Sequence, residues 1–157
     1  HFDYHGGPAG TAIMIYESGG YMARRAVWWL AMSGVFERHP GLRLVITEQF
    51  EGWWRQTLHE MDVVGARFGP DMELAERPSE YVKRSVFATF QDDPIGPATH
   101  HIFGADNYMW ASDFPHSDST FPDSQEWIRD NFQGVDAAVR RKIVHDNVVS
   151  LYGMELG

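Results

Sequence analysis

Several polar residues in this chain fall where an apolar, strand-like segment runs into a loop. They are His5, Glu48, the group Gln91 to Asp93, and Asp113. A strand holds such a side chain rigidly, and the loop that follows leaves space above it for a ligand. Each of these residue types can bind a metal ion or carry a proton. Their shared position at strand ends predicts a chemical site.

Asp113 and His5 are the first candidates for a metal-binding pair. A divalent ion such as zinc binds imidazole nitrogen and carboxylate oxygen, and a catalytic site leaves one position open for water. Asp113 follows the apolar run Tyr108 to Ser112 and is well placed for this role, although Asp also begins many ordinary turns. His5 is explained equally well as a capping or solvent-facing residue beside a Gly-Gly turn.

Other residues near these strand ends are candidates with open alternatives. Glu48 is a candidate general acid or base, and equally a partner for the amino terminus of the helix that starts near Gly52. Asp92 and Asp93 precede a proline and more simply form a turn. His116 directly follows a Phe-Pro step, so the sequence predicts that it lines a pocket.

The elements that must position these residues alternate between strand and helix. This alternation predicts an α/β domain over residues 1–157, with a parallel sheet covered by helices and chemistry at the carboxyl ends of its strands. Trp28, Trp29, Trp53 and Trp54 are predicted to be core residues. The predicted strands are 1–5, 42–47, 85–90 and 108–112, the predicted helices are 21–39, 52–68, 97–103, 122–132 and one capped by Asp136, and 6–20 is predicted to be a loop.

Composition excludes several classes of protein. The net charge of −9 and the absence of a Lys/Arg-rich run argue against nucleic acid or an anionic membrane as the main partner. Because there is no Cys, any metal must be bound by Asp, Glu or the 8 His residues. No apolar run is long enough to span a membrane, so we expect a cytoplasmic protein. The chain opens on a strand-like segment at His1, and we expect it to be the C-terminal part of a longer protein.

Three segments resemble amidohydrolase-related proteins, the group that contains aminocarboxymuconate-semialdehyde decarboxylase. The first is Ser-Gly-Val-Phe-Glu-Arg-His-Pro-Gly-Leu-Arg-Leu-Val from Ser33 to Val45, followed by Thr47-Glu48 and Gly52-Trp53. The second is Trp-Ala-Ser-Asp-Phe-Pro-His from Trp110 to His116. The third is the chain end, with Lys142-Ile143, Asn147 and Leu151-Tyr152. The resemblance extends over nearly the whole chain, and these segments are its most recognisable parts.

The resemblance implies a fold and a set of site residues. The chain would be the C-terminal half, strands five to eight, of a TIM-like (β/α)8 metal-dependent hydrolase barrel. His5 would fall at the strand-five metal position and Asp113 at the strand-eight position, while the family's strand-one His-x-His pair would lie outside this sequence. Glu48 stands where the decarboxylases have a catalytic His. Phe114 and His116 would border the substrate.

The resemblance also implies a function. We expect a metal-dependent hydrolase or non-oxidative decarboxylase that acts on a small carboxylated cyclic or aromatic compound, with Asp113 and Glu48 catalytic. The expected cofactor is a divalent metal, zinc or alternatively manganese. The expected partners are a small-molecule substrate and, for the full-length protein, a second copy in a homodimer. The alternative is a metal-free binding paralogue or a catalytically inactive barrel fragment.

Overall fold

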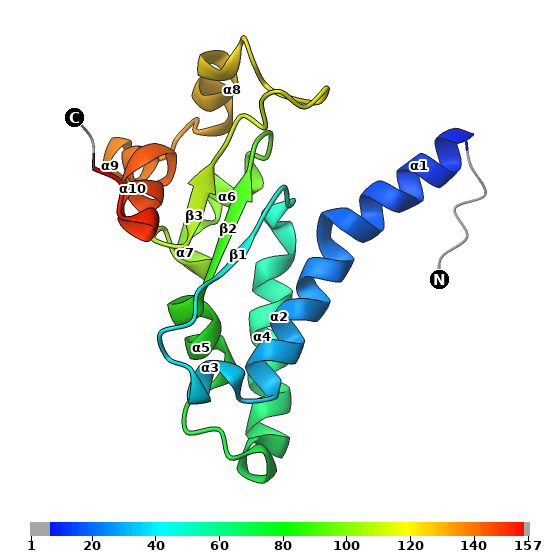
Figure 1. The fold of residues 1–157 in the computed structure, drawn as a ribbon, viewed down its shortest axis with the longest axis vertical. Coiled ribbons are helices and arrows are strands. Elements are labelled where there is room, and N and C mark those ends of the chain that lie inside the picture. The colour runs from blue at the N-terminus through cyan, green and yellow to red at the C-terminus, as the bar shows by residue number, and fades with distance from the viewer. Residues whose placement is uncertain (1–6, 156–157) are drawn as a thin grey trace.

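The computed structural model describes residues 7–155, and their sheet consists of three parallel strands. Strands β1 (Leu44–Ile46), β2 (Val86–Phe90) and β3 (Tyr108–Trp110) lie side by side in the order β1-β2-β3. In the register of the sheet, Leu44 faces Val86 and Ala88 faces Tyr108. Because all strands run in one direction, their carboxyl ends meet at one edge, the upper edge in Figure 1.

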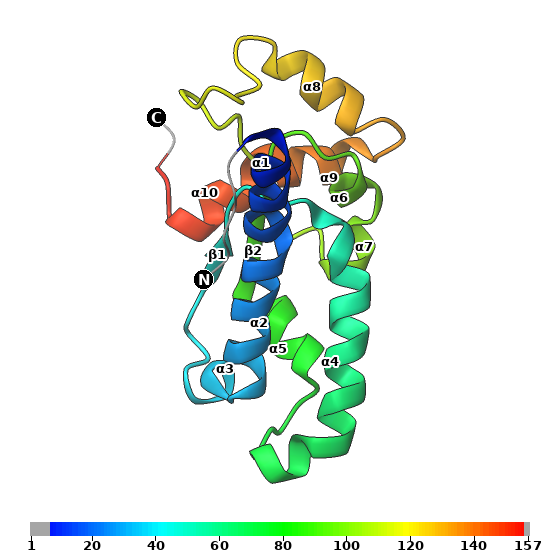
Figure 2. The same ribbon diagram turned by 90° about the vertical axis from the view of Figure 1, so that its right-hand side faces the viewer.

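Helices lie on two sides of the strands: in Figure 1, α9 and α10 are to the left of the sheet, and α2 and α4 are to its right. Figure 2 shows the same arrangement turned by 90°. Helices α2, α4 and α5 pack against one another, and α5 runs directly into β2. Helix α10 and the turn before it contact β3. The helical elements are α1 (Gly7–Tyr16), η1 (Glu17–Tyr21), α2 (Met22–Met32), α3 (Val35–Arg38), η2 (Glu51–Trp53), α4 (Trp54–Phe68), η3 (Gly69–Met72), α5 (Pro78–Ser85), α6 (Ile95–Ala98), α7 (His100–Phe103), α8 (Ser124–Asn131), α9 (Ala137–Arg141), η4 (Lys142–Asp146) and α10 (Asn147–Tyr152).

The predicted strands after position 40 are all present, but they are shorter than the apolar runs that predicted them. Pairing continues only where a neighbouring strand supplies hydrogen bonds, so β1 keeps three residues of the run 42–47 and β3 keeps three of 108–112. The strand predicted for residues 1–5 lies outside the described residues. In β2 the side chains alternate between fully and partly buried, as expected for a central strand.

Two predictions about the N-terminal region are wrong. The segment 6–20 was predicted to be a loop, but from Gly7 onward it is helical: α1 continues through η1 into α2. Six of the ten residues of α1 are Ala, Ile, Met or Tyr, which a helix accommodates. Each interior Gly destabilises a helix by only about 1 kcal/mol relative to Ala. The single helix predicted for 21–39 is interrupted at Gly34, whose φ of 70° suits glycine and ends α2 before α3 begins.

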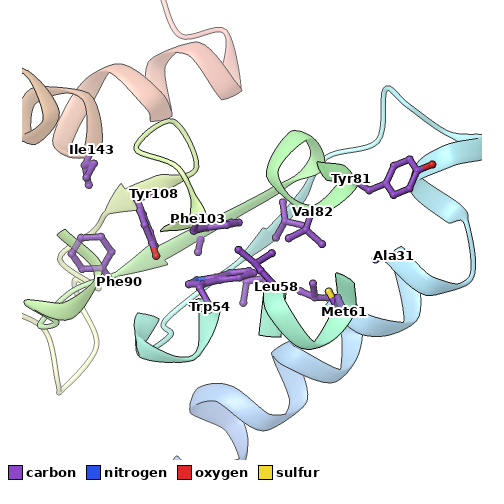
Figure 3. Packing of buried hydrophobic residues seen from close by; sticks show 14 of the residues in the cluster. Ala31, Trp54, Leu58, Met61, Tyr81, Val82, Phe90, Phe103, Tyr108 and Ile143 are labelled. Atoms are coloured by element: carbon purple, nitrogen blue, oxygen red, sulfur yellow. The ribbon is translucent and has the colours of Figure 1, made fainter. Parts of the chain in front are cut away.

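Aromatic side chains from three separate elements form the centre of the core (Figure 3). The ring of Trp54, at the start of α4, stacks on Phe103 of α7 at 3.7 Å between centroids. Phe103 in turn meets the edge of Tyr108 of β3 at 5.2 Å. Trp54 is buried and Trp28 and Trp53 are partly buried against this core, as predicted. The core prediction is wrong for Trp29, which is 65% exposed because its neighbour Trp28 takes the inward face of α2.

Two asparagine side chains fix the other end of the sheet, where the strands begin. Asn107 donates hydrogen bonds from Nδ2 to the carbonyl oxygens of Lys83 and Val86, each at 2.7 Å. Asn147, the first residue of α10, donates from Nδ2 to the carbonyl oxygens of Ala105 and Tyr108, also at 2.7 Å. The bonds of Asn107 tie the loop before β3 to α5 and β2, and the bonds of Asn147 tie α10 to β3. Together they fix where β2 and β3 begin relative to each other and to these helices.

Candidate functional site

The backbone is left-handed at both carboxylates that follow a strand. Glu48, after β1, has a φ of 55°, and Asp113, after β3, has a φ of 60°. Glu73 is the only other described non-glycine residue with positive φ. Such conformations cost on the order of 1–3 kcal/mol and are concentrated at active sites and ligand sites. Backbone strain therefore marks the same two carboxylates that the sequence singled out.

The structure brings Asp113 and His116 together. Asp113 Oδ2 lies 2.6 Å from His116 Nδ1, and the backbone N–H of His116 donates to the carbonyl oxygen of Asp113 at 2.8 Å. The Asp113 side chain is 21% exposed and that of His116 is 59% exposed. The tight turn thus holds one carboxylate oxygen on an imidazole, while no residue in 7–155 donates to Oδ1. That oxygen is available to an incoming group.

An exposed aromatic pair lies next to this turn. Phe114, predicted to line a substrate pocket, packs edge-on against Phe121 at 4.8 Å between ring centroids. Both rings are about three-fifths exposed, at 62% and 60%. The loop between them is tied back to the end of β3, because Thr120 N–H and Ser119 Oγ donate to the Ser112 carbonyl oxygen. Sequence reasoning missed Phe121, although its Phe-Pro step repeats that of Phe114.

Glu48 has a free side chain at the end of β1. Its backbone N–H donates to Thr89 Oγ1 on β2 at 3.2 Å, which fixes the position of the residue. The helical turn η2 that follows has no side-chain cap, so helix capping does not account for Glu48. The side chain is exposed and makes no hydrogen bond to any residue in the described range. Glu48 and Asp113 therefore stand at the same edge of the sheet, separated by β2.

Asp93 has a structural role, as the sequence predicted for the Asp92-Asp93 turn. Its Oδ2 accepts a hydrogen bond from the backbone N–H of Glu51 at 2.6 Å. Its Oδ1 accepts from the backbone N–H of Ile95 at 2.8 Å. One buried carboxylate thus ties the loop after β1 to the loop after β2. This link positions the segment that carries Glu48.

Sequence reasoning missed a buried acid, Glu51, beneath these loops. Glu51 is 1% exposed. Its Oε2 accepts a hydrogen bond from Trp54 Nε1, and its Oε1 is buried without a partner in the described part of the chain. Burial raises the pKa of Glu51 well above its ordinary value of 4.5, the bond from Trp54 opposes this, and the charge of Asp93 adds to it. Gly96 leaves the space that the side chain occupies, since a Cβ there would lie 3.1 Å from Glu51 Cγ. The only signal in the sequence was an acid directly before Gly-Trp-Trp.

The hydroxyl of Tyr108 belongs to the same buried region. It has no hydrogen-bond partner among residues 7–155, and its pKa is raised, chiefly by burial and further by the charges of Glu51 and Asp93. The other described histidines are surface residues: His39, His59, His101 and His145 are exposed, and His100 is half-buried with Nδ1 at 2.8 Å from the Pro97 carbonyl oxygen. None of them joins the strand-end residues.

The side chains at the strand ends are of types that bind divalent ions, but too few of the described ones lie together to form a site. Asp113 and His116 supply a carboxylate oxygen and an imidazole nitrogen, as zinc and manganese sites do. Within residues 7–155, however, no group of three or more His, Asp or Glu side chains is gathered to hold an ion. His5, the other predicted ligand, lies outside the described residues. The described residues therefore supply two donor groups of a suitable kind, but they do not form a metal site by themselves.

Helix length and polarity bear on membrane insertion. In the part of the chain that the structure describes, no helix is both long and apolar enough to span a bilayer.

The fold is similar to solved amidohydrolase structures. An amidohydrolase from Mycobacterium avium subsp. paratuberculosis K-10 superimposes with a TM-score of 0.71 at 22% identity, over 82% of this chain and 32% of that one. The 5-carboxyvanillate decarboxylase LigW from Sphingomonas paucimobilis gives 0.68 at 23% identity, over 85% and 40%. A dihydroxybenzoic acid decarboxylase from Polaromonas sp. JS666, with bound manganese and 2-nitroresorcinol, gives 0.68 at 18% identity, over 85% and 40%.

These likenesses show an α/β fold with a small parallel sheet, similar to part of the amidohydrolase TIM-barrel proteins. The chain spans only 32% to 40% of the length of these structures. No curated protein sequence matches the chain. The sequence profile of the family described as Amidohydrolase, however, matches residues 7–154, which is nearly all of the chain. The chain therefore belongs to the amidohydrolase family.

Proposed function

We propose that this protein is a divalent-metal-dependent hydrolase or decarboxylase that acts on a small carboxylated cyclic or aromatic compound. The observation that carries the proposal is the geometry of Asp113. A strand end, a left-handed backbone and a 2.6 Å contact with His116 hold its carboxylate in one orientation. Family membership and the aromatic acids named for two of the structural neighbours support the reaction class.

In this proposal β1, β2 and β3 are strands six, seven and eight of a (β/α)8 barrel, and the chain is its C-terminal half. The parallel order of the strands and the partial coverage of the neighbours support this assignment. His5 is then the strand-five metal ligand and Asp113 the strand-eight ligand. The strand-one ligands come from a part of the barrel that this sequence does not contain.

Each strand-end residue has a role in the proposal. Asp113 and His5 would hold a divalent ion, zinc or alternatively manganese, which would supply Lewis-acid chemistry at the substrate oxygen and lower the pKa of water. Asp113 helps to hold the ion and carries a proton, and His116 keeps its second oxygen oriented. Glu48 acts as a general acid or base, and Phe114 contacts the ring of the substrate. The full-length protein is proposed to be a cytoplasmic homodimer without nucleic-acid or membrane partners.

The test is made on the full-length protein with Asp113→Asn. The amide keeps the shape and loses the charge, so we expect kcat/KM to fall by at least about 100-fold and bound metal to decrease. Asp118→Asn, an exposed change in the same loop, is the control. Release of carbon dioxide from an aromatic acid identifies a decarboxylase, and its absence with turnover of an amide or lactone identifies a hydrolase. Retained turnover in Asp113→Asn contradicts both versions.

A metal-free binding paralogue is the second candidate, and one observation favours it. Residue 48 is a glutamate, and by the resemblance to the family's decarboxylases this position would carry a catalytic His, so part of the expected acid-base chemistry would be replaced. Elemental analysis separates the candidates: a full-length protein that retains no ion after purification from zinc- or manganese-containing medium, and that turns nothing over, is the paralogue. The 157 residues alone leave β1 and β3 as unpaired edges of the described sheet, so they are expected to be inactive.

A further inference from the structure

A hollow lies between the N-terminal helices and the loop that follows β1. Its volume is about 400 Å³, and it is lined from two directions. Ala12, Tyr16, Tyr21 and Arg24 come from α1, η1 and α2, whereas Phe50 and Trp53 come from the segment just after Glu48. We refer to these residues as the α1–η2 pocket. A volume of this size suits a small organic molecule.

The walls of the α1–η2 pocket are largely aromatic. Tyr16, Tyr21 and Phe50 are all exposed large hydrophobic residues that the rest of the described chain leaves uncovered. Trp53 stacks on the buried Trp54 at 3.9 Å between ring centroids, so this wall is anchored to the core. Exposed aromatic side chains gathered round one hollow provide flat apolar surfaces for a ring.

Arg24 is the one charged residue of the pocket lining in the described chain. It is half-buried, and within residues 7–155 it forms no hydrogen bond or ion pair. Its neighbour Arg25 is exposed and does not line the pocket. A guanidinium group without a protein partner, held among apolar walls, favours a carboxylate because it can donate two parallel hydrogen bonds to it.

Trp53 adds a second unpartnered donor to the pocket lining. Its indole N–H is buried and has no acceptor in the structure as described. Leaving such a donor unpaired costs about 1–3 kcal/mol. A ligand that brings an oxygen atom to this wall would recover part of that cost.

We propose that the α1–η2 pocket binds a small aromatic carboxylate, with the ring between Tyr16, Tyr21 and Phe50 and the carboxylate on Arg24. The proposal requires neither a metal ion nor Asp113. It therefore stands apart from the catalytic proposal, and each can fail without the other.

The experiment uses the metal-stripped full chain, with 2-naphthoate as the probe and calorimetry as the readout. The neutral isostere 2-naphthamide has the same ring without the charge, and we expect it to bind at least about 10-fold more weakly. Arg24→Gln should reduce naphthoate affinity by a similar factor, whereas Arg25→Gln, the matched control, should leave it within about twofold. Ala12→Phe fills the hollow without changing its charge and should weaken both probes.

The outcomes distinguish binding in the α1–η2 pocket from binding elsewhere on the protein. Naphthoate should shift one indole N–H resonance in a nuclear magnetic resonance spectrum, and the resonance that disappears in Trp53→Phe should be the one that shifts. Equal affinity for naphthoate and naphthamide, or equal losses in Arg24→Gln and Arg25→Gln, overturns the proposal. Loss of naphthoate binding in Asp113→Asn assigns the ligand to the strand-end site and also overturns it. Binding that survives in a catalytically dead Asp113→Asn protein supports the pocket and leaves the catalytic question to its own test.

Discussion

Glu51→Gln is the sharpest test of the buried acid beneath the strand ends. Burial raises the pKa of Glu51 well above 4.5 in the folded protein, so folding favours the protonated acid. The glutamine amide is neutral at every pH and has nearly the same shape. Its oxygen can accept the hydrogen bond from Trp54 Nε1 that Glu51 Oε2 accepts, and the contact with Gly96 is preserved.

The size of the effect follows from proton linkage. Between the unfolded pKa of 4.5 and the raised folded pKa, the folded state binds one more proton than the unfolded state. The free energy of unfolding of the native protein therefore falls with rising pH, by about 1.4 kcal/mol per pH unit from this one group. Glutamine removes this slope. The variant should gain stability relative to the native protein by about that amount per unit across this window, and its advantage should level off above the folded pKa.

Urea unfolding followed by tryptophan fluorescence, from pH 5.5 to pH 8, measures this difference. Subtracting the native curve from the Glu51→Gln curve cancels the contributions of all ionisable groups that the two proteins share. Glu126→Gln, an exposed change on α8, is the control and should give a difference that does not vary with pH. A flat difference for Glu51→Gln as well would show that Glu51 is ionised in the folded protein, and would refute the account of this cluster.

Further predictions concern the elements that support the site, and chemical denaturation measures each of them. Gly104→Ala should cost about 2–3 kcal/mol, because φ is 134° and the new Cβ would lie 2.3 Å from Asn107 Oδ1. Gly134→Ala, with φ at 75° but open space around it, should cost only about 1 kcal/mol, and equal losses at the two glycines would contradict the steric argument. Asn147→Ala should lower the free energy of unfolding by about 2–3 kcal/mol, because two carbonyl oxygens lose their donor. A loss below about 0.5 kcal/mol, less than one typical hydrogen bond contributes, would show that the link between α10 and β3 is dispensable. Asp136→Ala should cost about 1 kcal/mol by removing the cap on the Ala138 N–H, whereas Asp136→Asn should cost much less.

Local sequence was sufficient for the strands and for most helices. The runs 42–47 and 85–90 contain β-branched and aromatic residues between turn residues, and both contain a strand. Asp136 caps α9 and Pro78 opens α5, as their residue types predict. These features depend on contacts within a few residues, so they can be read directly along the chain.

The positions of the candidate carboxylates also followed from local sequence. A polar residue directly after an apolar run must fall at the carboxyl end of a strand, and Glu48 and Asp113 do so. Their role in catalysis stays a prediction, as does that of His5, which lies outside the described residues. The helix α1 was missed because frequent glycines mask a helix that its other residues sustain.

Sequence alone determined that this is an α/β chain with carboxylates at its strand ends, because strand and helix patterns are local and the side chain at each strand end is simply the next residue. Tertiary structure decided how those carboxylates are held. The bond from the Glu51 N–H to Asp93 joins residues 42 positions apart, and the burial of Glu51 depends on Gly96 and Trp54 closing round it. The left-handed backbone at Asp113 and its contact with His116 likewise exist only within the folded turn. The links made through Asp93 and Gly96 are set by the packing of distant segments, which no stretch of sequence contains.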